Sequence, residues 1–130
     1  MNGMKNKQTK ESIALSFYGN GVRVHGMFPR RYVIAPDNGY LRQIESNSIY
    51  GGCVELGNSK YKYIFKHIIC NVKNGMVIKG EIIGIVGKNP KTKKPLLYFE
   101  VQENEIPLSY NELIKFEILW KEKDVKVKDL

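Results

Sequence analysis

The sequence predicts an all-β domain with at most one short helix near the C-terminus, and three observations support this prediction. The 130 residues include eight Tyr and five Phe beside many Ile and Val, which are the residues that favour strands. Glycine recurs through the Ile- and Val-rich run 72–87, as expected for short strands joined by turns. Over Lys60–Lys66, aromatic residues alternate with lysines except at Ile64, which is the period of a half-buried strand.

Turn signals divide the first half of the chain into short elements. Ser12–Phe17 is an apolar segment, either a strand or a turn of helix, and a turn-rich run follows it. The sequence Pro-Asp-Asn-Gly at positions 36–39 strongly favours a turn. We therefore expect a hairpin whose arms are Arg30–Ala35 and Tyr40–Glu45.

The second half continues in the same way. Gly57-Asn58-Ser59 predicts a tight turn between a strand at Cys53–Leu56 and a long strand at Lys60–Cys70. A basic loop, Lys88–Lys94, precedes a compact strand at Leu96–Val101. Ser109 with Glu112 has the spacing of a capping box, which predicts a short helix over Asn111–Phe116.

We expect one domain over residues 12–118, between a basic tail at 1–11 and a charged tail at 119–130. No stretch approaches the ~18 apolar residues of a membrane helix, and Met1–Glu11 lacks the apolar core of a signal peptide. Cys53 and Cys70 are too few for a disulfide scaffold or a Cys-based zinc site, so we expect two free thiols.

The net charge of +8 favours anionic partners such as cell-wall polymers, anionic lipid or nucleic acid. The basic residues are scattered in small clusters, however, and no zinc-finger spacing, RNP-like strand or helix-turn-helix pattern accompanies them. We therefore expect no nucleic-acid partner.

Two segments carry specific information. Val72–Gly87 resembles the "VKxGxxVKKGxxIGxVG" stretch of the lysostaphin/LytM-type zinc endopeptidases, and Pro95–Val101 resembles their "PHLHFEV" strand. Tyr32–Gly39 is similar to the family's "PVxAPxDG" segment, and Phe65–Ile68 to its "YxHL" element. The resemblance extends over about residues 19–113. It implies a twisted, mostly antiparallel sheet sandwich or barrel of the duplicated hybrid motif type.

The resemblance also implies a catalytic zinc. Such a metal takes three protein ligands and activates a bound water. In the family the ligands come from "HxxxD" and the second His of "HxH", and two further His assist catalysis. In this sequence Leu96 and Tyr98 occupy the two His positions of "HxH", and the matching register places Gly19 and Arg23 at the "HxxxD" ligands.

In a second register, Phe17–His25 matches the "FGxRxHP" stretch that precedes "HxxxD", and the ligand segment is then deleted. In both registers only His67, at the "YxHL" position, keeps a functional histidine of the family. His67 is therefore the candidate catalytic relic or a structural histidine. A replacement metal site built from His25, His67 and a cysteine would require distant positions to converge.

The sequence predicts no metal site and no cofactor, with zinc expected only if the protein is an active peptidase. The old substrate groove is the candidate binding surface, with core filling as the alternative reading for its apolar members. If Arg23 points into this groove, it could bind a carboxylate there through a bidentate pair. The candidate groove residues are Arg23, His25, Leu96, Tyr98, Lys91 and Lys93.

Three functions are considered, of which the first two follow from the resemblance. The first is a catalytically inactive binding or scaffolding module, with a protein partner or peptidoglycan, in the cell envelope. The second is an active peptidoglycan endopeptidase with a rearranged zinc site. A relative of lipoyl-type or sugar-phosphotransferase carriers is the weakest, because the sequence shows no lysine-bearing hairpin of the lipoyl type. The sequence does not decide the compartment or the oligomeric state.

Overall fold

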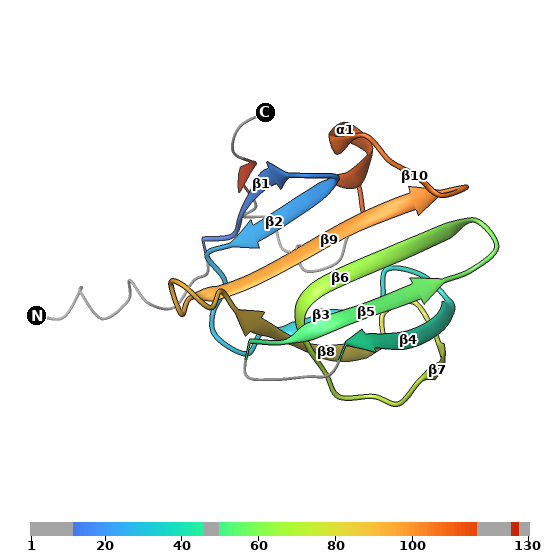
Figure 1. Ribbon diagram of the computed structural model, residues 1–130, viewed down its shortest axis with the longest axis horizontal. Helices are drawn as coiled ribbons and strands as arrows, with labels where there is room; N and C mark the ends of the chain where they lie inside the picture. The colour runs from blue at the N-terminus through green and yellow to red at the C-terminus, as the bar shows by residue number, and fades with distance from the viewer. Residues whose placement is uncertain (1–11, 46–49, 117–125, 128–130) are drawn as a thin grey trace, which may run out of the picture.

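A computed structural model describes residues 12–45, 50–116 and 126–127. The predicted all-β fold is confirmed: the described chain forms a mostly antiparallel sheet with one short helix near the C-terminal end. Its strand order is β11-β1-β2-β9-β8-β6-β5-β4-β7, with β3 paired to β8 and β10 to β9. Figure 1 shows β2, β9, β6 and β5 side by side, with β3, β4, β7 and β8 below them.

The described residues form strands and one helix in the following order along the chain. They are β1 (Ala14–Tyr18), β2 (Gly21–His25), β3 (Tyr32–Ile34), β4 (Gly39–Glu45), β5 (Gly52–Gly57), β6 (Tyr61–Cys70), β7 (Gly75–Val77), β8 (Ile82–Lys88), β9 (Pro95–Glu103), β10 (Ile106–Pro107), α1 (Tyr110–Leu113) and β11 (Lys126–Val127). The predicted tail 1–11 lies outside the described residues. Within the predicted C-terminal tail, β11 pairs in parallel with β1.

The alternation of side chains gives the central strands two different faces. One row runs across four strands through Val22, Phe99, Phe65 and Val54, which pair in register and are at most 1% exposed. This row belongs to the main hydrophobic core. The neighbouring residues on each strand therefore point to the opposite face, where the candidate site lies.

A bulge at His67 lets β6 pair with two different strands. Up to Lys66, β6 pairs with β9, and from Ile68 onward it pairs with β8. On the other side of β6 the register with β5 shifts at the same place. His67 itself has a φ of +64°, as expected for a residue at a bulge. The strand turns out of one half of the sheet and into the other at this histidine.

Two glycines make room for the backbone of this bulge. A Cβ on Gly51 would lie 2.4 Å from the carbonyl carbon of His67, and a Cβ on Gly87 would lie 2.8 Å from its carbonyl oxygen. Neither distance is compatible with a side chain, so only glycine allows these backbones to approach so closely.

The predicted hairpin between Arg30–Ala35 and Tyr40–Glu45 is wrong. The first arm forms β3, which pairs with β8, and the second forms β4, which pairs with β5 and β7. The turn at 36–39 is therefore a corner that carries the chain between different partners. Its anchor is Asp37, whose carboxylate accepts hydrogen bonds from Tyr63 Oη (2.8 Å) and Asn58 Nδ2 (3.0 Å).

The predicted capping box is confirmed. Ser109 Oγ accepts from the backbone N–H of Glu112, whose carboxylate accepts from the N–H of Ser109. The helix itself spans Tyr110–Leu113 and is shorter than predicted. After Leu113, Lys115 and Phe116 bond to carbonyls three residues earlier, so the last turn tightens.

Both cysteines are free thiols, as expected, with Cys70 buried and Cys53 partly buried. Within the described ranges, no helix has the length and apolar character that crossing a membrane would require.

The anchor at Asp37 gives a prediction about stability. Burial alone would raise the Asp37 pKa, but hydrogen bonds from Tyr63, Asn58 and the Asn38 N–H outweigh it and hold that pKa below its usual value. A depressed carboxyl pKa stabilises the fold above the ordinary value near 3.9, and this stability is lost as pH falls through the folded pKa. We expect Tyr63→Phe to lower the free energy of unfolding by about 1–2 kcal/mol at pH 7.

Urea denaturation measures this loss, and we expect it to shrink below pH 4 as Asp37 becomes protonated. Tyr40→Phe is the matched control, because the Tyr40 ring is half exposed on β4 and should change stability little. Equal effects of the two variants would contradict the role of Asp37.

Candidate functional site

The candidate site is a second row of residues, on the opposite side of the sheet from the core row. Arg23 on β2 lies directly across from Tyr98 on β9, and Lys66 on β6 lies across from the other side of Tyr98. Ser16 and Cys53 extend the row onto β1 and β5. Because opposite residues in a ladder have Cβ atoms about 5 Å apart, these side chains share one surface.

Tyr98 is the centre of the row and is held by a buried carboxylate. Its side chain is 8% exposed, and its hydroxyl donates to Glu100 Oε1 at 2.7 Å. Gln102 Nε2 donates to the other oxygen of Glu100 at 3.0 Å. Burial and the hydrogen bond to Glu100 raise the pKa of Tyr98 well above its usual value. The phenol is therefore protonated at neutral pH, with its proton directed to Glu100.

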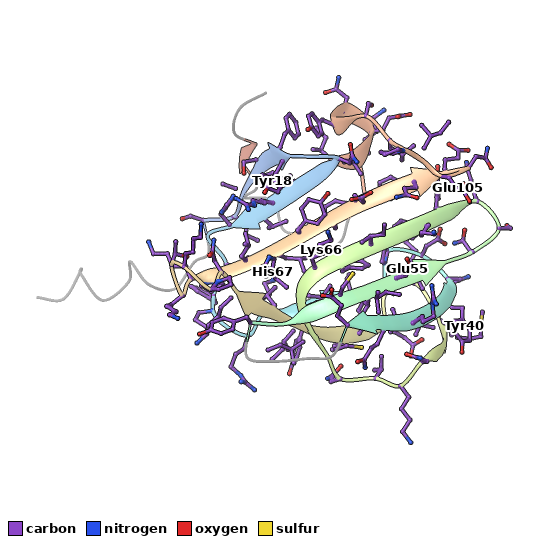
Figure 2. The ribbon with its side chains drawn as sticks, in the orientation of Figure 1. Tyr18, Tyr40, Glu55, Lys66, His67 and Glu105 are labelled. Carbon is purple, nitrogen blue, oxygen red and sulfur yellow. The ribbon has the colours of Figure 1, made fainter. Side chains whose placement is uncertain are left out.

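Two cations flank Tyr98, and each lies on an aromatic ring. The Arg23 guanidinium is 3.7 Å from the centroid of the Tyr18 ring, and Lys66 Nζ is 5.5 Å from that of Tyr98. Tyr18 packs edge-on against Tyr98 at 6.3 Å. Within the described part of the chain, neither cation has a carboxylate within ion-pair distance. Figure 2 shows Tyr18 near β1 and β2, and Lys66 and His67 near β6 and β9.

His67 lies beside these cations at the bulge. Burial is the main cause that lowers its pKa below the usual value, and the positive charges of Arg23 and Lys66 lower it further. A backbone hydrogen bond with Tyr50 acts in the opposite direction but does not cancel them. The imidazole is therefore neutral at pH 7.

The two residues at the predicted "HxH" positions form the floor of the site rather than its walls. Leu96 is 2% exposed and Tyr98 is 8% exposed, so little of either reaches solvent. Both point away from the core row, because they alternate along β9 with Leu97 and Phe99.

The remaining predicted groove residues lie around the edges of the site. His25 is on the same face of β2 as Arg23 but is hydrogen-bonded to Ser16 Oγ at 2.8 Å. Lys91 and Lys93 lie in the exposed loop between β8 and β9. Lys93 Nζ donates to Tyr50 Oη at 2.9 Å, so this loop reaches the segment that contacts His67.

Sequence reasoning missed Tyr18, Lys66 and Glu100 as members of the site. Alternation along β9 from Tyr98 could have identified Glu100, since residues two apart share a face. Lys66 precedes His67 directly, but its place beside Tyr98 depends on the pairing of β6 with β9. Tyr18 could be assigned to the site only with knowledge of the turn between β1 and β2, which brings it beside Arg23.

No group of three or more His, Cys, Asp or Glu side chains that could hold a metal ion occurs among the described residues. The position between Arg23 and Lys66 instead carries two positive charges, one protonated phenol and a carboxylate whose two oxygens already accept hydrogen bonds.

Comparison with known proteins gives a family and a set of related structures. Residues 18–110 match the model of Peptidase family M23. The catalytic domain of the antimicrobial peptidase lysostaphin from Staphylococcus simulans is 26% identical, with a TM-score of 0.54 over 73% of this chain and 72% of that one. The catalytic domain of the prophage-encoded M23 protein EnpA from Enterococcus faecalis, solved as a mutant, is 20% identical, with a TM-score of 0.55 over 72% and 78%.

A zinc-containing peptidase from Vibrio cholerae is 24% identical, with a TM-score of 0.56 over 68% of this chain but only 28% of that one. No curated protein sequence matches this chain. The described fold matches that of M23 catalytic domains, and this chain spans about a quarter of the length of the Vibrio cholerae peptidase chain.

His67 gives a prediction about pH. Its folded pKa lies below its ordinary value near 6.5, so the unfolded chain binds the proton first, and stability falls as pH drops from 6.5 toward the folded pKa. We expect His67→Asn to remove this part of the loss, because Asn does not titrate and tolerates a positive φ. Urea denaturation at pH 7.5 and pH 5.5 measures the difference for both proteins.

The pKa of His67 itself can be followed by NMR. Arg23→Gln should raise it by removing a nearby positive charge, whereas Lys62→Gln, which is not among the charges acting on His67, should leave it unchanged. A His67 that titrates at or above its ordinary pKa would contradict this description of the site.

Proposed function

The chain belongs to peptidase family M23, and from this premise we propose that it is a non-catalytic member that binds a partner through the site around Tyr98. The observation that carries the proposal is the pair of cations, Arg23 and Lys66, on either side of Tyr98. The family relationship suggests a cell-envelope setting, with peptidoglycan or a protein of the envelope as the partner.

The residues present do not fit a catalytic zinc. Such a site requires three neutral or anionic ligands and an open position for water. Arg23 and Tyr98 are cross-strand neighbours, as two ligands of one metal would be, and this supports the register that places them at ligand positions. Neither is suited to this role: a guanidinium has no lone pair to offer, and the Tyr98 hydroxyl donates its hydrogen bond to Glu100.

The electrostatics also oppose a divalent cation. Two unit charges at 4 Å interact by about 4 kcal/mol at an effective dielectric constant of about 20, so a dication would be repelled by one guanidinium by about 8 kcal/mol. Stacking on the ring of Tyr18 holds the guanidinium in place, and moving it away would forfeit about 1 kcal/mol of cation–π attraction. If Arg23 alone moved away, the positive charge of Lys66 would still repel the metal ion, and the metal would still lack ligands.

The binding part of the proposal rests on what the site retains. Tyr18 is 53% exposed beside Arg23, and Lys66 is exposed beside Tyr98, over a floor formed by Leu96 and the Tyr98–Glu100 pair. Tyrosine and arginine, the pair formed by Tyr18 and Arg23, are enriched in recognition surfaces. We place His67 in this site as a positioning group for the bulge rather than as a catalyst.

The proposal predicts that the purified full-length protein contains no stoichiometric zinc and does not hydrolyse peptidoglycan. Elemental analysis and a peptidoglycan-clearing assay measure both. A variant with Gly19→His, Arg23→Asp, Leu96→His and Tyr98→His restores the family's ligand types and should gain zinc. The same variant without Tyr98→His should gain much less. One zinc per wild-type chain, lost together with activity in His67→Ala or His25→Ala, would instead establish an active peptidase with a rearranged site.

A second prediction separates the two kinds of partner. If peptidoglycan is the partner, sedimentation with purified sacculi should retain the wild-type protein and release the double variant Arg23→Ala, Lys66→Ala. A matched double variant, Lys62→Ala with Lys79→Ala, removes the same charge and should remain bound. Absence of retention would leave an envelope protein as the partner.

A further inference from the structure

We propose that the site binds a peptide carboxylate, with the anion held between the Arg23 guanidinium and the Lys66 ammonium above the Tyr98 ring. This inference rests on the proposed binding function and specifies the chemistry that the site recognises. The proposed binding position lies on β9, between β2 and β6, where Arg23 and Lys66 both pair with Tyr98.

The two cations are arranged to receive an anion from above the sheet. Adjacent strands lie about 4.8 Å apart, so Arg23 and Lys66 are separated by about 10 Å of backbone, with Tyr98 between them. Their side chains lie on the same face of the sheet as the Tyr98 ring between them. Since neither has an ion-pair partner among the described residues, the positive charge of both is available to a ligand.

Aromatic contacts restrict the motion of both cations before a ligand arrives. The planar guanidinium of Arg23 stacks on Tyr18, and Tyr18 in turn contacts Tyr98 edge-on. Lys66 lies over Tyr98 itself. The ordering of side chains that binding usually requires is therefore partly complete, which lowers the entropic cost of binding.

The charge balance favours a carboxylate over a phosphate. Both oxygens of Glu100 accept hydrogen bonds, one from the Tyr98 hydroxyl and one from Gln102 Nε2, so this carboxylate lies at the hydroxyl end of Tyr98. Arg23, Lys66 and Glu100 together then carry a net charge of +1. A monovalent anion neutralises this charge, whereas a dianion leaves an excess. The fork of a guanidinium also matches the two oxygens of a carboxylate.

The direct test is NMR titration of the full-length protein, in the presence of EDTA, with acetyl-tetraglycine and with its C-terminal amide. The acid should cause saturable shifts at Arg23, Lys66 and Tyr98, and the amide should cause none. Acetyl-Gly-Glu-Gly amide shows whether a side-chain carboxylate serves as well as a terminal one. Inorganic phosphate is the competing probe. Binding of the amide as tightly as the acid, or tighter binding of phosphate, overturns the inference.

Variants then assign the binding to these two residues. Arg23→Ala and Lys66→Ala should each weaken binding of the acid at least ~10-fold, which corresponds to about 1.4 kcal/mol. Arg23→Lys keeps the charge without the fork and should give an intermediate loss. Lys62→Ala removes one charge from the same face of β6 and should stay within about twofold of wild type. An equal loss in Lys62→Ala, or unchanged binding in Arg23→Ala, contradicts the inference.

His67 provides a readout that a purely structural effect would not move. A bound carboxylate offsets the positive charges that act on His67, so saturation with the acid should raise its pKa, and an unchanged pKa places the anion elsewhere. The outcome is independent of the zinc measurement. Stoichiometric zinc in the protein would contradict the non-catalytic proposal. If the wild-type protein shows no binding of the acid that depends on Arg23 and Lys66, the carboxylate proposal is wrong.

Discussion

The bulge at His67 is the constraint on which the rest of the structure depends. Because β6 leaves β9 and joins β8 at this residue, one strand serves both halves of the fold. The bulge in turn requires glycine at 51 and 87, where any side chain would collide with the His67 backbone. It also places the imidazole next to the positive charges of Arg23 and Lys66. The bulge therefore sets both the strand pairing at the site and the position of the imidazole beside the two cations.

The two faces of the sheet have separate roles. The core row through Val22, Phe99 and Phe65 faces away from the site, so its packing does not depend on which residues occupy the other face. On that other face, the Tyr98 hydroxyl donates a hydrogen bond to Glu100. A buried carboxylate is stable there only because both of its oxygens have partners.

This arrangement gives physical content to the idea of a peptidase fold used for binding. Catalysis by zinc requires lone pairs directed at one point, whereas recognition of an anion requires positive charge directed at the same point. In this chain the described residues at that point are cationic and protonated, and aromatic rings hold the cations in place. The same cross-strand geometry can therefore serve either chemistry, and the side chains decide which.

The sequence by itself determined the fold class, the short strands, the capping box and the resemblance of four ordered segments, because alternation, turn residues and motif spacing are local properties of the chain. It also proposed Arg23, His67, Leu96 and Tyr98 as candidate site residues. Only the tertiary structure decided that the Pro36–Gly39 turn is a corner and not a hairpin, because strand pairing depends on distant partners. It alone brought Lys66 beside Tyr98 and Tyr18 beneath Arg23, since those neighbours come from three separate parts of the chain.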